Sequence, residues 1–422
     1  MRYTICMRKF IVIEFLLIVA GQLFACTIGV ASEKATADGR PLLWKTRDRG
    51  SHPNNKIYYS VSDSLSYIAV TDQDEPDVWM GMNEAGFAIL NSTSTDLNQY
   101  REDDGVFMRI AVGRCSTVEE FEAFLIETNG ERNTYSNFGA IDALGNAAIF
   151  ETGSDEYWRF DADSTDTGYL IRTNFSVNGG GTSGTRRFER SQILLEDFAM
   201  GDSLTHRSIL RYQMRDFADS AGNAIDIPYA SQWQNSHPFG YIETYGSICG
   251  PSNVSAVVFR GVLPVEPPVL TTMWTILGHP SAAIALPYWC VGAIPPEANC
   301  GNTAPLCDFA LQLKDLLYDN PLDGTHIDTY KLVNENSTGF WQELFASEDS
   351  LFTVTENLLD IWRVNTPSNT EVELAMHNLA EEGMLKLMDL PRQWPIIADF
   401  EIEQNNGIAP AYLDFYDTSL HG

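Results

Sequence analysis

The sequence predicts an α+β fold in which large mixed sheets pack on each other and are covered by helices. Strand-like segments occur in blocks and helix-like segments in separate blocks, which favours layers over a sheet of alternating βαβ units. The chain has 422 residues, 44% of them hydrophobic, so it can bury a large core without relying on disulfides. No internal repeat or low-complexity linker interrupts it. We therefore expect a single domain over residues 26–422, more helical from about residue 305.

Residues 1–25 have the character of a secretory signal peptide. Three basic residues precede a mostly apolar run over residues 10–25, and the small residue Ala25 ends this run directly before Cys26. The run is short for a membrane span, and no later apolar run reaches about 18 residues. We therefore expect an exported protein, periplasmic or extracellular, with no stable membrane insertion after removal of the signal.

The first part of the mature chain is predicted to be rich in strands. Short strands at 27–31 and 41–44 flank the turn residues Asp38 and Gly39. Further strand-like segments, each broken by turn residues, occupy residues 58–62, 66–71 and 78–90.

Helices and strands then follow in blocks. Residues 116–119 (STVE) have the form of a capping box, which predicts a helix over residues 118–128. A hairpin with Gly145 and Asn146 at its tip is expected over residues 137–152. Strands are expected at 156–162, 168–175, 255–262, 270–277 and 282–289, and helices at 186–199, 203–219, 309–319, 352–362 and 371–390.

The charge balance excludes some partners. The formal net charge is -30, spread along the chain and not gathered in a tail. Such a surface repels nucleic acid and anionic lipid headgroups, so neither is expected as a partner. A homo-oligomer remains compatible with the sequence.

Cys26 stands where the apolar segment ends, and three interpretations are open from this stretch alone. It can be a small buried residue near the start of a strand. It can be a lipidation site, because Leu23, Phe24 and Ala25 before a cysteine approach a bacterial lipobox. It can also be catalytic: cleavage after Ala25 would give Cys26 a free α-amino group that serves as the base for its own thiol.

Four motifs in order support the catalytic interpretation. The strand from Cys26 turns near Asp38-Gly39 and returns to Lys45 and Asp48; residues 81–88 (GMNEAGFA), 170–175 (LIRTNF) and 187–190 (RFER) follow. Together they resemble the cysteine branch of the N-terminal nucleophile (Ntn) hydrolases. That branch includes choloylglycine hydrolases, penicillin V acylases and acyl-CoA:6-aminopenicillanic acid acyltransferases. The resemblance implies a four-layer αββα sandwich and no cofactor or metal.

The resemblance also implies roles for six residues. Cys26 would be the nucleophile, and Asp48 would hold its α-amino group. Asn91 and Asn174 match asparagines at or near the oxyanion hole, where an amide N–H donates without adding charge. Arg187 matches an arginine near the nucleophile, and Lys45 stands where the family often has arginine.

The identity of the basic residue stays open between Lys45 and Arg47. On a strand both point to one face, while Asp48 points to the other. We favour Lys45, whose charge would lower the pKa of the thiol.

The predicted function is an exported amidohydrolase or acyltransferase that cleaves linear, non-peptide C–N bonds of a small acyl-amide through a thioester. The alternative is a non-catalytic binding protein of the same fold, anchored to a membrane by a lipid on Cys26. A Cys-His protease is a third hypothesis, although none of the seven histidines lies in a recognisable signature.

Two further features carry smaller predictions. Cys290, Cys300 and Cys307 lie close together, which is consistent with one disulfide among them in an oxidising compartment. The glycine-rich stretch at 178–185 (NGGGTSGT) lacks the spacing of a phosphate-binding loop, so we expect a flexible active-site loop.

Overall fold

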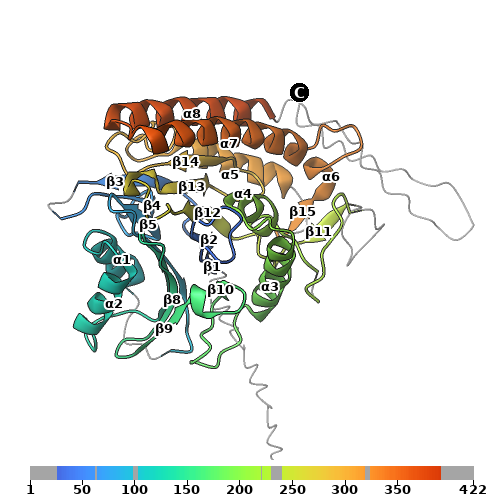
Figure 1. Cartoon of the computed structure of the whole chain (residues 1–422). Helices are drawn as coiled ribbons and strands as arrows, with labels where there is room; N and C mark the ends of the chain where they lie inside the picture. Colours follow the sequence, from blue (N-terminus) through green and yellow to red (C-terminus); the bar gives the residue numbers. More distant parts are fainter. Residues whose placement is uncertain are drawn as a thin grey trace, which may run out of the picture.

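The computed structural model describes residues 26–61, 64–97, 103–219, 221–229, 240–318 and 324–390. The expected signal peptide lies outside the described residues. Two large antiparallel sheets stack face to face, and helices cover both outer faces (Figure 1). This arrangement is the αββα sandwich, and the α+β prediction is confirmed.

One sheet has six strands and contains the strand that follows Cys26. In spatial order these strands are β10 (Tyr169–Arg172), β1 (Thr27–Ala31), β2 (Leu42–Asp48), β12 (Asn253–Arg260), β13 (Thr272–Leu277) and β14 (Ala285–Tyr288). β1 therefore lies between two hydrogen-bonded neighbours. Trp44 packs so closely over Gly29 of β1 that a Cβ atom there would lie 2.1 Å from the indole ring.

The other sheet is a seven-stranded meander, in which each strand pairs with the next one along the chain. Its strands are β3 (Asn55–Ser60), β4 (Tyr67–Asp72), β5 (Met80–Asn83), β6 (Ala88–Thr93), β7 (Ser136–Ile141), β8 (Ala147–Thr152) and β9 (Tyr157–Asp161). The expected hairpin is present as β7 and β8, and Gly145 in its turn has a φ of 96°. A short pair, β11 (Tyr241–Glu243) and β15 (His326–Asp328), lies apart from both large sheets.

Helices α1 (Asp104–Val112) and α2 (Val118–Glu127) cover the outer face of the seven-stranded sheet (Figure 1). Aromatic side chains fill this layer, with the rings of Phe107 and Phe124 stacked at 4.9 Å and Phe121 packed edge-on to Phe138. Burial of several large rings makes the layer one of the main apolar contributions to stability.

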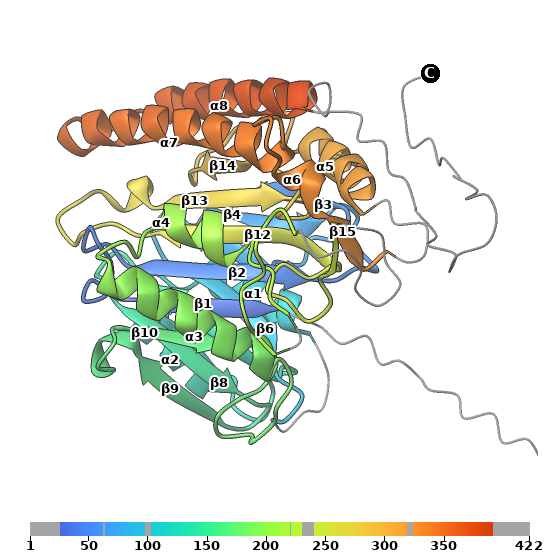
Figure 2. The same cartoon turned by 90° about the vertical axis from the view of Figure 1, so that its right-hand side faces the viewer.

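Helix α3 (Thr185–Met200) covers the outer face of the six-stranded sheet, together with α4 (His206–Ser208) and a π-helical stretch, Ile209–Gln213 (Figure 2). Trp44, Leu195 and Trp274 are buried in this layer. Besides these two outer layers, a larger cluster of apolar residues lies between the two sheets and extends to the C-terminal helices.

From residue 305 to 390 the described chain is mostly helical, with connecting loops and the short β15. It contains α5 (Pro305–Leu317), α6 (Thr329–Leu332), α7 (Phe340–Val364) and α8 (Asn369–Asp389). Helices α7 and α8 run side by side above β13 and β14 (Figures 1 and 2). Leu286 of β14 packs against Gly383 of α8.

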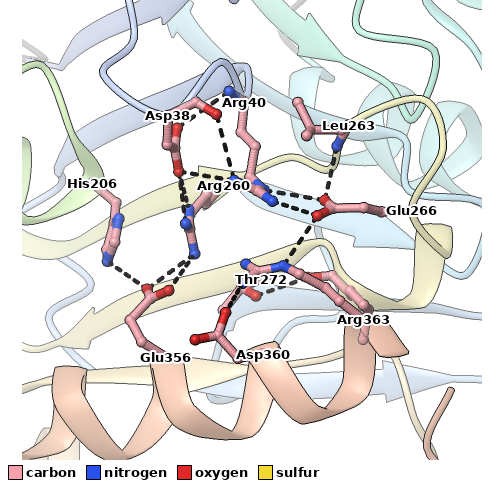
Figure 3. A network of polar contacts seen from close by, with 11 residues as sticks. Asp38, Arg40, His206, Arg260, Leu263, Glu266, Thr272, Glu356, Asp360 and Arg363 are labelled. Atoms are coloured by element: carbon pink, nitrogen blue, oxygen red, sulfur yellow. Dashed lines mark hydrogen bonds and ion pairs between the residues drawn. The ribbon is translucent and has the colours of Figure 1, made fainter. Parts of the chain in front are cut away.

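A network of charged residues joins α7 to the turn between β1 and β2 (Figure 3). Arg260, at the end of β12, donates to Asp38 in that turn and to Glu356 of α7. Arg40 pairs with Glu266, which also pairs with Arg363 of α7. These ion pairs connect segments more than 90 residues apart in the sequence and fix α7 against the sheet.

Two local predictions are corrected, and one helix was missed. The N-cap of α2 is Thr117, whose hydroxyl accepts from the Glu120 N–H at 3.1 Å, so the cap lies one residue later than expected. In place of the expected helix over 203–219, the structure has only α4 and the π-helical stretch. Thr205 caps the start of α4, and the helical structure ends before Met214, where a loop begins. Helix α1 was not predicted.

Among the described residues, no helix is both long and apolar enough to cross a membrane.

Candidate active site

The six residues predicted for the site are all buried in the structure. They are Cys26, Lys45, Asp48, Asn91, Asn174 and Arg187, none of them more than 7% exposed. They lie at one end of the sandwich, where β1 begins and β2 ends.

Cys26 immediately precedes β1, and its side chain continues the alternation of that strand. Ile28 and Val30 point into the core between the sheets, so Cys26 faces the same way. Burial lowers the pKa of three cations near it, Lys45, Arg47 and Arg187, and the charge on Cys26 partly opposes this effect in each of them. The sequence therefore brings a thiol to a position surrounded by positive charge.

Arg187 links the start of β1 to Asn174. It follows Gly184, which has a φ of 84° and allows the chain to enter α3. Its guanidinium donates to the backbone carbonyl of Cys26, to Thr27 Oγ1 at 3.0 Å and to Asn174 Oδ1 at 2.8 Å. Burial lowers the pKa of Arg187 to about 10, and the charges of Cys26 and Asp48 oppose this effect. Arg187 is thus a positioning residue between the predicted nucleophile and an amide donor.

Asn174 is held so that its amide nitrogen is oriented. Arg187 fixes its oxygen, and its Nδ2 donates to the carbonyl of Thr93 at 2.9 Å. Among the described residues, only Thr93 accepts from this nitrogen, which leaves the second N–H for a ligand oxygen. Such a fixed donor is what an oxyanion requires.

Lys45 lies on the face of β2 that points between the sheets, as alternation predicts. Its ammonium donates to Asn91 Oδ1 at 2.7 Å and to the Trp79 carbonyl at 3.2 Å. Burial lowers the pKa of Lys45 from its usual 10.5 to about 8, and the charge of Cys26 opposes this effect. Lys45 is therefore still mostly protonated at neutral pH, but its charged form is less favoured than that of an exposed lysine.

The side chain of Asn91 does not fit the expected role of oxyanion donor. Its Nδ2 donates to Asp104 Oδ2 at 2.9 Å and to Ser136 Oγ at 3.2 Å, and its oxygen accepts from Lys45. An amide nitrogen has two hydrogens, so both are committed. The side chain of Asn91 holds Lys45 instead.

Arg47, the second basic candidate, is engaged elsewhere. It forms a bidentate pair with Asp72, at 2.6 and 3.0 Å, and donates to Asn55 Oδ1 at 2.6 Å. Its guanidinium also lies 4.5 Å from the ring centroid of Trp79. Asp72 neutralises much of its charge, so these contacts favour Lys45 over Arg47 as the basic partner of Cys26.

Asp48 points to the opposite face of β2 from Lys45 and Arg47. Burial raises the pKa of Asp48, while a hydrogen bond with Ser252 and the charges of Arg187 and Lys314 oppose this effect. Its closeness to Arg187 places a carboxylate near the start of β1.

The segment around Asn174 is held by residues that the sequence analysis missed. Asn137 donates to the carbonyls of Thr173 and Phe175, at 3.2 and 3.0 Å, and accepts from Ser176 Oγ at 2.7 Å. Asn137 belongs to a predicted strand, and a polar residue on a fully buried strand was the signal that could have revealed it. Asp104 carried no such signal, because its helix was not predicted.

Hydrogen bonds to two carboxylates hold the backbone of the glycine-rich stretch after Asn174 along much of its length. The carboxylate of Asp96 accepts from the N–H groups of Ser176 and Gly181. The carboxylate of Glu151 accepts from the N–H groups of Val177 and Asn178. The backbone thus wraps around two carboxylates, which argues against the expected flexible loop.

The expected disulfide is not formed, because the three thiols lie in separate surroundings. The thiol of Cys290 donates to the Ser66 carbonyl, Cys307 accepts from the Asn55 N–H, and Cys300 is exposed. All three cysteines are free.

Two buried histidines, His206 and His279, do not form the Cys-His pair of the third hypothesis. His206 stacks on Trp274, and both ring nitrogens of His279 are occupied by Ser281 and the Gly250 carbonyl. Within the described ranges, neither ring contacts Cys26. These ranges also contain no group of three or more His, Cys, Asp or Glu residues placed to hold a metal ion.

A polar pocket of about 590 Å³ lies at the ends of the strands that carry Arg47 and Asp72. Its volume is in the range of small-molecule sites. It is lined by Ser51, His52, Pro53, Asn54, Gln73, Asp74 and Asn302.

The structure has the two features that the resemblance to the cysteine Ntn hydrolases implied: an αββα sandwich, and a buried cysteine directly before a central strand. Residues 35–197 match the model of the acyl-coenzyme A:6-aminopenicillanic acid acyltransferase family. The match confirms the resemblance predicted from the sequence. The matched range begins after Cys26 and includes the other five predicted site residues.

Solved structures to which the chain is similar include a bile acid hydrolase, a penicillin acylase and an acid amidase ortholog. A mutant of conjugated bile acid hydrolase from Clostridium perfringens is 15% identical, with a TM-score of 0.37, over 60% of this chain and 89% of that chain. Penicillin V acylase from Agrobacterium tumefaciens is 12% identical, with a TM-score of 0.37, over 63% and 85%. The Caenorhabditis elegans ortholog of N-acylethanolamine-hydrolyzing acid amidase is 11% identical, with a TM-score of 0.35, over 56% and 92%. No curated protein sequence matches the chain.

Proposed function

We propose that this protein is an exported Ntn amidohydrolase or acyltransferase that cleaves linear, non-peptide C–N bonds of acyl-amides through a thioester on Cys26. The observation that carries the proposal is the position of Arg187, which bonds to both Cys26 and Asn174. One side chain thereby sets the distance between a nucleophile and an oxyanion donor.

The first half of the reaction forms the acyl-enzyme. Removal of residues 1–25 gives Cys26 a free α-amine, which accepts the thiol proton. The sulfur attacks the acyl carbon, and the Asn174 N–H donates to the oxygen that becomes negative. The C–N bond then breaks, and the α-ammonium returns its proton to the leaving amine. The charge of Lys45 favours the thiolate before attack.

The second half of the reaction regenerates the thiol. Water attacks the thioester and yields a carboxylic acid, or an acceptor amine attacks and yields a new amide. In each case the α-amine of Cys26 removes a proton from the attacking group and returns it to the departing sulfur. Asn174 again donates to the oxyanion.

Turnover of a panel of acyl-amides, measured as release of free amine, tests the proposal. We expect Cys26→Ala to lower kcat by about 10³-fold or more, since it removes both nucleophile and thioester. Cys300→Ser is the matched control, because that cysteine is exposed and should be dispensable. Unchanged turnover in a correctly processed Cys26→Ala variant would refute the mechanism. A diacylglycerol on Cys26 together with binding but no turnover would support the anchored binding protein instead.

A further inference from the structure

Lys45, Asn91 and Asp104 form a buried array between β2, β6 and the start of α1. Lys45 Nζ donates to Asn91 Oδ1 at 2.7 Å, and Asn91 Nδ2 donates to Asp104 Oδ2 at 2.9 Å. All three side chains are 2% exposed or less. A cation and a carboxylate are therefore joined through one amide, out of contact with water.

The direction of the amide is fixed by its neighbours. An ammonium can only donate, so the oxygen of Asn91 must face Lys45 and its nitrogen must face Asp104. The nitrogen can only donate, so Asp104 must accept. Thr134 and Ser136 also donate to the Asp104 carboxylate. Three donors around one carboxyl group favour its ionised form.

The other charges near Lys45 are already paired. Lys45 faces Cys26, Arg47, Asp104 and Asp72. Asp72 is bound by the fork of Arg47 and lies 3.6 Å from Arg49. Among the described residues, no arginine or lysine bonds directly to Asp104. Asp104 is therefore the carboxylate whose charge is available to Lys45.

We propose that Asp104, acting through Asn91, is a positioning residue that keeps Lys45 protonated beside the Cys26 thiolate. This inference rests on the proposed function, in which the Lys45 charge assists the thiolate. An ionised Asp104 stabilises the ammonium across the amide, whereas a neutral group there leaves the ammonium buried without a counter-charge.

The surroundings of both groups are consistent with such coupling. Burial raises the pKa of Asp104, and Ser136, Thr134, Asn91 and the charge of Lys45 oppose this effect. Burial lowers the pKa of Lys45 to about 8, and the charges of Cys26 and Asp104 are among those that oppose it. Each group favours the charged form of the other.

The test compares Asp104→Asn, Lys45→Arg and the double variant by the rate at which iodoacetamide alkylates Cys26 at pH 7 and at pH 8, read by mass spectrometry of the Cys26 peptide. We expect Asp104→Asn to slow alkylation about twofold at pH 7 and about fivefold at pH 8, as for a fall of about one unit in the pKa of Lys45. Arginine stays protonated, so Asp104→Asn should have no effect on alkylation in the Lys45→Arg background. With a substrate, the alkaline limb of the activity profile should move about one pH unit lower in Asp104→Asn.

Two further variants separate this role from folding. Thr134→Val keeps the shape and removes one donor to Asp104, so it should slow alkylation in the same direction by less. Asp142→Asn changes a buried carboxylate that accepts from two backbone N–H groups in the β7–β8 turn and from the Val118 N–H at the start of α2. Cys26 in this variant should be alkylated at the wild-type rate.

Equal alkylation rates in the wild type and Asp104→Asn would overturn the proposal. An equal loss when Asp104→Asn is made in the wild type and in the Lys45→Arg variant would overturn it too, since it would indicate a structural role. Alkylation needs no substrate, so this result stands even if no acyl-amide is turned over.

Discussion

Lys45 carries a positive charge into the space between the two sheets, and burial makes that charge costly. Its pKa is lowered from 10.5 to about 8, which corresponds to roughly 3 kcal/mol of destabilisation at neutral pH. The penalty is complete below about pH 8 and is relieved as pH rises towards 10.5. A buried lysine whose charge destabilises the fold in this way is typical of a functional site.

We expect Lys45→Met to increase the free energy of unfolding by about 1–3 kcal/mol at pH 7, because it removes a buried charge but leaves Asn91 without a donor. This increase in the free energy of unfolding should become smaller above pH 8. The turnover of the variant should be lower than that of the wild type. Urea unfolding of wild type and variant at several pH values measures this, with the exposed Lys34→Met as control. A Lys45→Met protein that is less stable than wild type at every pH would contradict the account.

At the scale of single residues, the sequence predicted which side chains lie together in the site. It did not predict the hydrogen-bond partners of each one. Strand alternation correctly placed Lys45 and Arg47 on one face and Asp48 on the other. The commitment of Asn91 to Asp104 could not be predicted, because it depends on how α1 packs on a distant strand. The assignment of catalytic roles remains a prediction.

At the scale of elements, the rigidity of Asn174 depends on the segment from Thr173 to Gly184. Asn137 on β7 bonds to the carbonyls on either side of Asn174, and Asp96 and Glu151 hold the backbone that follows. A donor fixed before the reaction requires no reorganisation during it.

We expect Asn137→Ala to lower kcat about 10- to 100-fold with little change in KM, because a small displacement of Asn174 affects mainly the transition state. Steady-state kinetics on any turned-over acyl-amide measures this, and thermal unfolding monitors stability. Asn299→Ala, which breaks a hydrogen bond to the Ile57 carbonyl, is the control and should leave kcat unchanged. An equal fall in kcat for both variants would show a general loss of structure.

Elements with a strong local pattern were predicted well, and those that depend on tertiary contacts were not. The β7–β8 hairpin and α3 follow from turn residues and periodicity. The helix expected from Ser203 ends early, because its apolar residues pack as a short π-helical turn against α3 and β12. The glycine stretch looked flexible, since the two carboxylates that bind it lie far away in sequence.

In the molecule as a whole, the charged network of Figure 3 joins α7 to the turn between β1 and β2. This turn follows the end of β1, whereas Cys26 precedes its start. Burial raises the pKa of Asp38, but Arg260 and Arg40 outweigh this and leave it lowered. The pKa of Glu266 is likewise lowered, with burial opposed by Arg40. A lowered carboxyl pKa stabilises the fold above the usual values of 3.8 and 4.5, and this stability is lost as pH falls through the folded-state values.

We expect Arg260→Met to destabilise the protein by about 3 kcal/mol, because Asp38 and Glu356 lose a buried partner. The melting temperature of the wild type should fall more steeply below about pH 4 than that of the variant. Activity below the melting temperature should be retained, since the network is remote from Cys26. If the melting temperatures of the wild type and Arg260→Met changed with pH in the same way, the stabilising role of the Arg260 ion pairs would be contradicted.

The central claim is that Cys26 carries the acyl group, and mass spectrometry of acid-quenched enzyme during turnover tests it most directly. The account predicts an N-terminal peptide that begins at Cys26 and gains the mass of the acyl group while substrate is present. Product formation without that adduct, or an active chain that retains residues before Cys26, would contradict it.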